Sequence, residues 1–416
     1  MENKNMLYIE AGLDIGNGYV KGGADVNGGV KSGIDFLSGV AYQTHSHDIK
    51  VGEADLPGVI DDIYNYMEAS FDSPAIVDNT RRLFGRRGVQ SGRSMEEFDV
   101  SSSLSKAQQD LSSVLVLGSL AGKALQYYWN TYKALPDEML EVTARIGLAL
   151  PITEFKAYRK AYAAKFKEGS HIVSIHNFEK QVRVQIVIED VQVLAEGASA
   201  QYAIIDKGEV LMNSMLKDLR MHGDMFEGIT AQDILQAQNT VGVDIGEGTT
   251  NFPVFLDGKF NPDSSATFNK GYGTVLEQAR ERIQASGLPG FNSRKALSDF
   301  LQREPSRMQQ ARYNRVMQIV DEEIEGFCME ITQEFRKVIS RVGSYVEVVY
   351  IYGGGASPVK PSLYPALLKA AQSMGGDDMM YPILYLDSRY SRYLNEEGLY
   401  LVVKKLSAVV KAKAAK

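Results

Sequence analysis

Two stretches of the chain share one order of apolar and polar positions. Residues 6–26 (MLYIEAGLDIGNGYVKGGADV) contain an apolar run, an Asp, an Ile, a Gly-x-Gly and a second β-rich run. Residues 240–256 (TVGVDIGEGTTNFPVFL) repeat that order. Each copy predicts two strands joined by a Gly-rich turn. We interpret the repeat as an internal duplication that opens each of two α/β halves.

The pattern between and after the two copies supports this division. In the first half we expect a buried strand ending at Pro151 and an amphipathic helix over 154–166 capped by Thr153. Two or three strands then span 171–197, and a helix spans 198–217. In the second half the pattern predicts helices over 273–286 and 308–342, a strand running into the glycines at 353–355, and a last strand, loop and helix over 382–406.

Composition narrows the class of protein. The chain has 416 residues, 44% hydrophobic and 23% charged, which is typical of a globular protein with room for two domains. A net charge of −7 lacks the basic footprint of a direct nucleic-acid binder. The single cysteine excludes an intrachain disulfide framework, and the five histidines show no metal-ligand spacing.

The apolar content does not indicate a membrane protein. The N-terminus has no basic segment followed by an apolar one, so we expect no secretory signal. The most apolar stretch, residues 111–125, is too short to cross a bilayer and is interrupted by Lys123. We therefore expect a cytoplasmic location and no membrane contact.

The Gly-rich turns carry the candidate chemistry. In such a tight turn Gly16, Gly18, Gly246 and Gly248 can take positive φ angles and present backbone N–H groups without a Cβ in the way, and successive N–H groups of this kind form an anion-binding nest. Two such nests would hold a polyphosphate, and Lys21 would add a positive charge.

The two aspartates that precede the turns add a cation to this prediction. Asp14 and Asp244 would lie beside the phosphates, where carboxylates are repelled unless a hydrated Mg²⁺ lies between them. The pattern thus predicts a magnesium–nucleotide site, although each Gly-x-Gly taken alone is more often a plain hairpin turn.

Three motifs in order carry a family resemblance. The set LDIGNGYVK, VGVDIGEGTTN and VYIYGGGASPV resembles the phosphate-1, phosphate-2 and adenosine motifs of the actin, sugar-kinase and heat-shock-chaperone ATPase superfamily. The resemblance implies an α/β actin-like fold, with two duplicated ribonuclease-H-like domains around a nucleotide cleft. Domain I would span 1–205 with an inserted subdomain at about 31–104, and residues 388–416 would pack back on it. Domain II would span 206–387 with an insertion at about 266–339.

The same resemblance implies roles for individual residues, with ATP or GTP and Mg²⁺ as cofactors. Asp14 and Asp244 would orient Mg²⁺ through its waters, and Glu196 would position the attacking water, unless Glu196 is only a solvated turn residue. The nucleotide-binding residues would be Gly16, Asn17, Gly18, Tyr19, Lys21, Gly246, Glu247, Gly248, Thr249, Thr250, Gly271, Gly273, Gly353, Gly354, Gly355 and Ala356.

Within the superfamily, residues 146–155 and 191–205 resemble the bacterial plasmid-segregation actins of the ParM/StbA type, as does the C-terminal stretch 385–402. Residues 40–110 match nothing. This resemblance implies a filament-forming ATPase that segregates plasmid DNA, with itself and a small DNA-binding adaptor of the ParR type as partners. A small-molecule kinase, a chaperone, and a filament with a phage or cell-organisation role are the alternatives.

One charged cluster falls in the unmatched stretch. Five arginines lie between residues 81 and 93 without aromatic residues suited to stacking on bases. We expect them to form a solvated or subunit-contact face, with DNA contact as the less favoured reading.

Overall fold

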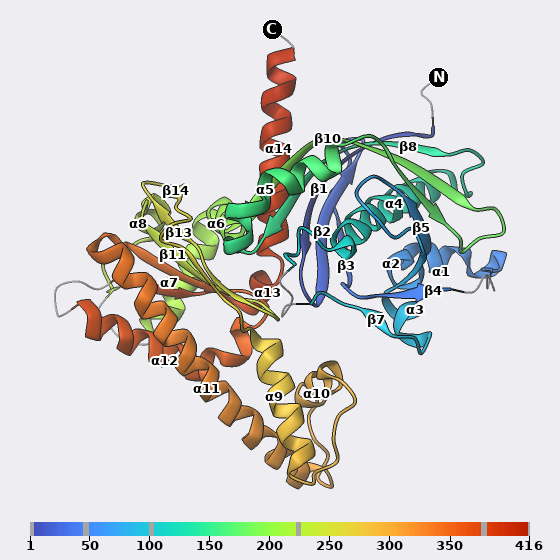
Figure 1. Ribbon diagram of the computed structural model, residues 1–416. Helices are drawn as coiled ribbons and strands as arrows, with labels where there is room; N and C mark the ends of the chain where they lie inside the picture. The colour runs from blue at the N-terminus through green and yellow to red at the C-terminus, as the bar shows by residue number, and fades with distance from the viewer. Residues whose placement is uncertain (1–3, 45–49, 100–103, 222–225, 376–380, 415–416) are drawn as a thin grey trace. The chain divides into compact units, whose positions relative to one another are not determined.

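The protein is a mixed α/β chain that divides into two compact units. This computed structural model describes residues 4–44, 50–99, 104–221, 226–375 and 381–414. Unit 1 comprises Met1–Ala203 and Tyr393–Lys416, and unit 2 comprises Ile204–Arg392. Each unit contains its own sheet, drawn in Figure 1.

Unit 1 is built on a 10-stranded sheet with the order β3-β2-β1-β8-β10-β9-β5-β6-β4-β7. Its strands are β1 (Met6–Ile15), β2 (Tyr19–Val26), β3 (Ser32–Leu37), β4 (Val40–Gln43), β5 (Glu68–Asp72), β6 (Arg81–Phe84), β7 (Met95–Glu96), β8 (Leu140–Leu150), β9 (His171–Ile175) and β10 (Val182–Ala195). Its helices are α1 (Leu56–Asp61), α2 (Ile63–Tyr66), α3 (Gly85–Gln90), α4 (Asp110–Tyr132), α5 (Ile152–Lys167) and α14 (Leu394–Ala414). Helix α6 (Ala198–Asp206) crosses the boundary into unit 2.

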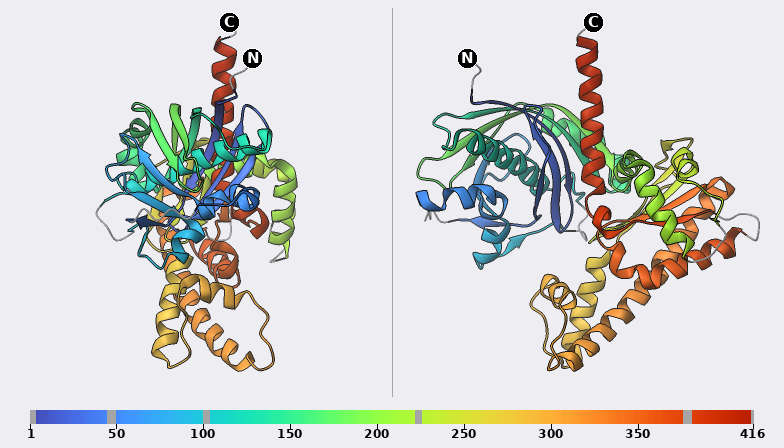
Figure 2. Two further views of the ribbon diagram at one scale, coloured as in Figure 1. Left: turned by 90° about the vertical axis from the view of Figure 1, so that its right-hand side faces the viewer. Right: turned by 180° about the vertical axis from the view of Figure 1, so that it is seen from behind.

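The apolar run of the first repeat becomes the central strand of unit 1. β1 pairs with β2 in antiparallel fashion and with β8 in parallel fashion. Helix α4 lies in the core between the sheet and α2, and its residues 111–125 are all buried. This position accounts for apolar residues on most sides of the helix. Figures 1 and 2 show α4 and α14 on opposite sides of β1.

The stretch that resembles nothing known extends this sheet. Residues 40–96 form β4 to β7 and α1 to α3, and β5 pairs with the edge of β9. The expected solvated arginine face is wrong at Arg82, which is 1% exposed and stacks 3.9 Å from the Tyr42 ring. Arg81 and Arg87 contact the fully buried Glu68 carboxylate at 3.3 and 2.5 Å. Arg81 and Arg87 therefore compensate the buried charge of Glu68, and Arg82 packs on the Tyr42 ring. The clustering of these arginines in sequence does not reveal such contacts.

Unit 2 is built on a 7-stranded sheet with β11 (Thr240–Ile245) at its centre. β11 pairs with β12, β13 and β16, and β16 pairs with β17. The other strands are β12 (Thr250–Phe252), β13 (Val254–Leu256), β14 (Lys259–Phe260), β15 (Ala266–Phe268), β16 (Val348–Tyr352) and β17 (Ile383–Tyr385). The helices are α7 (Gly208–Arg220), α8 (Ala231–Gln236), α9 (Tyr272–Ala285), α10 (Arg294–Leu301), α11 (Gln310–Val342), α12 (Ala356–Gly375) and α13 (Ser388–Ser391).

Two local expectations are wrong. Thr153 does not cap α5, because the helix begins at Ile152 with Pro151 in the cap position and no capping side chain. The helix expected over 198–217 is broken into α6 and α7, since Gly208 adopts a φ of +63° that a continuous helix cannot contain. Within the described part of the chain, no helix has the length and apolarity needed to cross a membrane.

The C-terminal helix α14 is anchored on the sheet of unit 1 by two buried acids. Glu10 and Asp25 lie opposite each other on β1 and β2, and each is 1% exposed. Lys404 on α14 reaches Glu10 Oε2 at 2.6 Å and Asp25 Oδ2 at 3.1 Å, and the Tyr400 hydroxyl donates to Asp25 at 2.8 Å. The sheet therefore depends on α14 for charge compensation as well as for apolar cover.

We predict that Lys404→Met lowers the free energy of unfolding of unit 1 by about 2 kcal/mol, because it leaves two buried carboxylates without their ammonium partner. The loss is smaller than for a fully buried pair since Lys404 is partly exposed. Chemical denaturation followed by far-UV circular dichroism measures it. Lys405→Met removes an exposed lysine from the same turn and is the control. Equal stability of the two variants would contradict the anchoring role.

Candidate functional site

The first Gly-rich turn is a tight loop over residues 16–19 at the end of β1. The Gly16 N–H donates to the Tyr19 carbonyl at 3.0 Å, and Asp14 lies directly opposite Lys21 on β2. Ser38 supports the loop, because its hydroxyl donates to the Gly16 carbonyl at 2.6 Å and its N–H donates to the Gly18 carbonyl at 3.0 Å. Residues 16–19 remain half-buried, so the loop presents its backbone at the surface of unit 1.

The second Gly-rich turn, residues 246–249 in unit 2, has the same construction. The Gly246 N–H donates to the Thr249 carbonyl at 2.9 Å, and Asp244 lies directly opposite Asn251. These residues are also half-buried, whereas Asp244 is 5% exposed. The duplication seen in sequence is thus reproduced in hydrogen bonds and strand register.

The reason for the glycines differs from the one expected. Gly16, Gly18, Gly246 and Gly248 do not have positive φ angles. Instead a Cβ at Gly16 would meet the Tyr19 carbonyl oxygen at 2.7 Å, and one at Gly246 would meet the Thr249 oxygen at 3.0 Å. The first glycine of each turn therefore permits a close approach across the loop rather than a left-handed conformation.

An acidic and basic cluster lies near the first loop in unit 1. The Lys106 ammonium, just before α4, contacts Glu196 Oε1 at 2.9 Å, and both side chains are buried. Burial raises the pKa of Asp14, and the Glu196 carboxylate raises it further, while Lys21 and Lys106 oppose the rise. For Lys106, burial alone would lower the pKa, but the Glu196 and Asp14 carboxylates raise it. Glu196 is thus not the solvated turn residue of the alternative reading.

The turn after β10 fixes where Glu196 lies. Glu196 is held at the strand end by its N–H, which donates to the Leu150 carbonyl at 2.7 Å. Gly197 follows with a φ of +77°, and Asn395 Oδ1 accepts from the Gly197 N–H at 3.0 Å and from the Ser199 hydroxyl at 2.8 Å. The start of α14 therefore braces the turn that carries Glu196.

The second loop is braced by the start of α9. The N–H groups of Tyr272 and Gly273 donate to the carbonyls of Gly246 and Glu247 at 3.0 and 2.8 Å. Thr250 is fully buried, and its hydroxyl donates to the Lys270 carbonyl at 2.9 Å, so it supports the loop from behind. The Glu247 side chain lies 3.7 Å from the Arg294 guanidinium of α10.

The third glycine cluster packs against the same loop. Gly355 donates its N–H to the Ile245 carbonyl at 2.8 Å, and the Ser391 hydroxyl donates to the Gly353 carbonyl at 2.9 Å. Gly353 has a φ of +102°, and a Cβ there would lie 2.4 Å from the Ile245 oxygen and 2.6 Å from Asp244 Oδ1. A side chain at Gly353 would displace the Asp244 carboxylate.

The comparisons with known proteins agree with this construction. Residues 242–364 match the family model "Archaeal actin homologue MreB-like, C-terminal". The structure of the actin-like protein Alp7A has 16% identity and a TM-score of 0.63, covering 99% of this chain and all of Alp7A. The archaeal actin homolog Ta0583 gives 14% identity and a TM-score of 0.61, covering 95% of this chain and 99% of Ta0583.

A third structure, Bacillus thuringiensis ParM with ATP, gives 15% identity and a TM-score of 0.60, and the match covers 97% of this chain and all of that protein. No curated protein sequence matches significantly. This chain has an actin-like fold.

In this actin-like chain the expected site residues fall into two groups. Unit 1 brings together Asp14, the 16–19 loop, Lys21 and Glu196. Unit 2 brings together Asp244, the 246–249 loop, Gly271 and Gly273 at the start of α9, and residues 353–356.

Sequence reasoning missed Ser38, Lys106 and Asn395. Lys106 and Ser38 lie in polar or Gly-flanked stretches that read as surface. Asn395 lies in the C-terminal stretch 385–402, whose resemblance implies no role for this residue.

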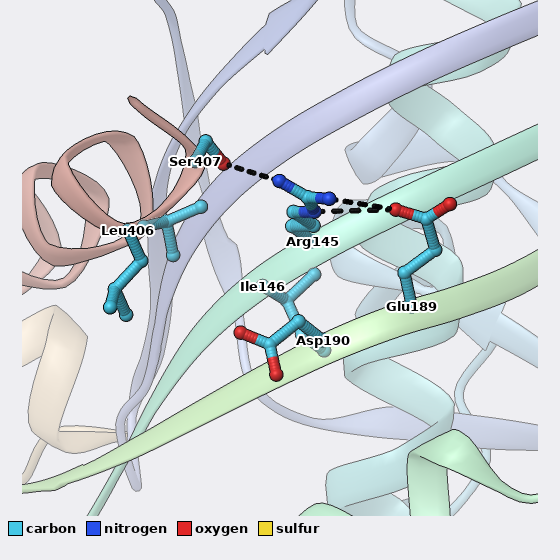
Figure 3. A pocket seen from close by; sticks show the side chains of 7 residues that line it. Arg145, Ile146, Glu189, Asp190, Leu406 and Ser407 are labelled. Carbon is cyan, nitrogen blue, oxygen red and sulfur yellow. Dashed lines mark hydrogen bonds and ion pairs between the residues drawn. The ribbon is translucent and has the colours of Figure 1, made fainter. Parts of the chain in front are cut away.

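A cavity of about 230 Å³ in unit 1 shares no residue with either group. Figure 3 shows Arg145 between Glu189 on β10 and Ser407 on α14, with Leu406 and Ile146 nearby. Arg145 contacts Glu189 at 3.2 Å and donates to the Ser407 hydroxyl at 3.2 Å. This cavity is a gap beside α14 and not part of the loop site.

We predict that Gly353→Ala destabilises unit 2 by at least about 2 kcal/mol, because a Cβ at a positive φ adds backbone strain to the clash with Ile245 and Asp244. Thermal unfolding monitors the loss. Gly326→Ala on α11 is the control, since nothing lies within 4 Å of its Cβ position. It should stabilise the helix by about 0.5–1 kcal/mol. A neutral effect of Gly353→Ala would show that the close packing of the third glycine cluster is not required.

Proposed function

We propose that this chain is a nucleotide-dependent, filament-forming ATPase that drives plasmid DNA segregation. The observation that carries the proposal is the pair of Gly-rich loops with equal register, each following an aspartate at the end of a central strand. Alp7A and ParM, named above, share the fold, and the ParM structure was determined with ATP.

In this proposal each loop binds phosphate oxygens of the nucleotide through its backbone. The loop residues are half-buried, and successive backbone N–H groups in such a loop suit an anion. Lys21 adds an ammonium beside Asp14. The third glycine cluster packs against the second loop, and it is the part of unit 2 that we propose for contact with the nucleoside. GTP carries the same phosphates as ATP, so the loops suit both nucleotides. The choice between the two bases depends on contacts that the loops do not provide.

The residues present fit a magnesium ion. Burial raises the pKa of Asp14, so a cation beside its carboxylate would favour the ionised form. Asp14 and Asp244 are the residues that would hold the ion through its waters, in the manner usual for Mg²⁺ bound with phosphates. When bound, the ion neutralises charge on the phosphate oxygens.

Glu196 has the position and chemistry for aligning water. Its carboxylate lies in the same electrostatic cluster as Asp14, at a strand end fixed by α14. Phosphoryl transfer mainly requires alignment of the nucleophile and compensation of charge, which an ionised carboxylate can provide by accepting a hydrogen bond from water.

The filament and its partners follow from fold and charge. A contact between different faces of successive copies produces a filament when the rotation between copies does not close a ring. Because the chain carries a net charge of −7, DNA would be reached through a small basic adaptor of the ParR type rather than directly.

We predict that the purified protein forms sedimentable polymers with Mg-ATP or a non-hydrolysable analogue, and that Glu196→Gln lowers the phosphate release rate about 100-fold while the polymers persist longer. Light scattering with a phosphate-release assay measures both. Glu179→Gln removes an exposed carboxylate of unit 1 and should behave as the unmodified protein.

Polymers with adaptor-bound plasmid DNA would support the segregation role. Nucleotide binding without polymer would contradict the proposal and favour a small-molecule kinase of the same fold.

A further inference from the structure

Lys106 is the one buried lysine that contacts the proposed hydrolytic carboxylate among the residues that the structure describes. Its side chain is 5% exposed and that of Glu196 is 11% exposed, with 2.9 Å between Nζ and Oε1. The pair belongs to unit 1 and needs nothing from unit 2 for its geometry.

The backbone around Lys106 is fixed on several sides. The Glu154 carboxyl group on α5 lies close to the backbone of Lys106 and Ala107. Residues 105–109 form a compact turn, because the N–H groups of Gln108 and Gln109 donate to the Ser105 carbonyl at 2.9 and 3.3 Å. The lysine thus extends from a rigid turn at the start of α4.

The immediate surroundings restrict the ammonium further. The Phe98 ring centroid lies 5.5 Å from Nζ, which favours a cation over the ring. The charges of Glu196 and Asp14 act on the same ammonium. One buried cation therefore serves two carboxylates of the site.

A role in stability alone explains this arrangement poorly. The free-energy cost of removing both charges from water offsets most of their attraction. Well-packed apolar residues in the same place often give equal or greater stability. A buried ammonium in direct contact with the Glu196 carboxylate is suited instead to holding that carboxylate in one orientation.

We infer that Lys106 is the positioning residue for Glu196: its ammonium holds the Glu196 carboxylate in the orientation in which it can accept a hydrogen bond from the attacking water. This inference rests on the proposed function. Without the ammonium the buried carboxylate would lose its charged partner and turn away, and it could no longer accept that hydrogen bond. Lys106 acts through Glu196 and is not assigned a contact with the nucleotide.

The test is a double-mutant cycle with Lys106→Met and Glu196→Gln, read by single-turnover phosphate release and by nucleotide affinity. We expect Lys106→Met to lower the release rate about 30-fold with little change in affinity, and to have no further effect in the Glu196→Gln background. Lys106→Arg should restore the rate to within about 3-fold, because it keeps the charge. Lys160→Met removes an exposed lysine of α5 and should change nothing.

A second readout uses the nucleotide-free protein and does not depend on hydrolysis. Lys106→Met should lower the melting temperature, and Glu196→Gln should largely abolish that difference, because a neutral amide needs no ammonium partner.

The outcomes separate the inference from the proposed function. Equal losses of phosphate release on Lys106→Met in both backgrounds would overturn the inference, since Lys106 would then act independently of Glu196. A lower melting temperature of Lys106→Met with an unchanged release rate would also overturn the inference, because the pair would then only stabilise the fold. An unmodified protein that binds nucleotide but releases no phosphate would overturn the proposed function, and the inference with it.

Discussion

The close approach of a carbonyl oxygen to the first glycine of each Gly-rich loop is the constraint on which the site depends. The carbonyl oxygens of Tyr19 and Thr249 lie 2.7 and 3.0 Å from the positions that a Cβ would take at Gly16 and Gly246. This approach lets β1 turn into β2, and β11 into β12, within a few residues, so an aspartate remains at each strand end. The packing of α9, Ser38 and Gly353 around the loops follows from that tight geometry.

Much of this fold could be predicted from sequence, because its signals are local. The two Asp-Ile-Gly-x-Gly runs and the strand before Gly353 predicted the strands, the turns and their order along the chain. Apolar residues that alternate on both sides of a glycine turn favour pairing of the two neighbouring strands, independently of the rest of the chain. The resemblance of these motifs to a known superfamily implied the actin-like fold, and the comparisons confirm it.

Other features depend on contacts that sequence does not display. Lys106 lies in a polar stretch and gives no sign that it meets Glu196 ninety residues later. The arginines near residue 82 read as a surface cluster, yet Arg82 is buried against Tyr42. The first glycine of each loop needs no positive φ angle, because it serves the close approach of a carbonyl oxygen three residues later. For Lys106 and Arg82 the deciding partner is remote in sequence, and only the folded chain identifies it.

The central claim is that both Gly-rich loops take part in nucleotide binding. Amide hydrogen exchange, followed by mass spectrometry on the nucleotide-free protein and on protein saturated with Mg-ATP, tests it most directly. The account predicts that exchange slows together over residues 16–19 and 246–249, and that magnesium alone slows neither. Slower exchange in one loop only, or in neither at saturating nucleotide, would contradict the claim that both duplicated loops take part in nucleotide binding.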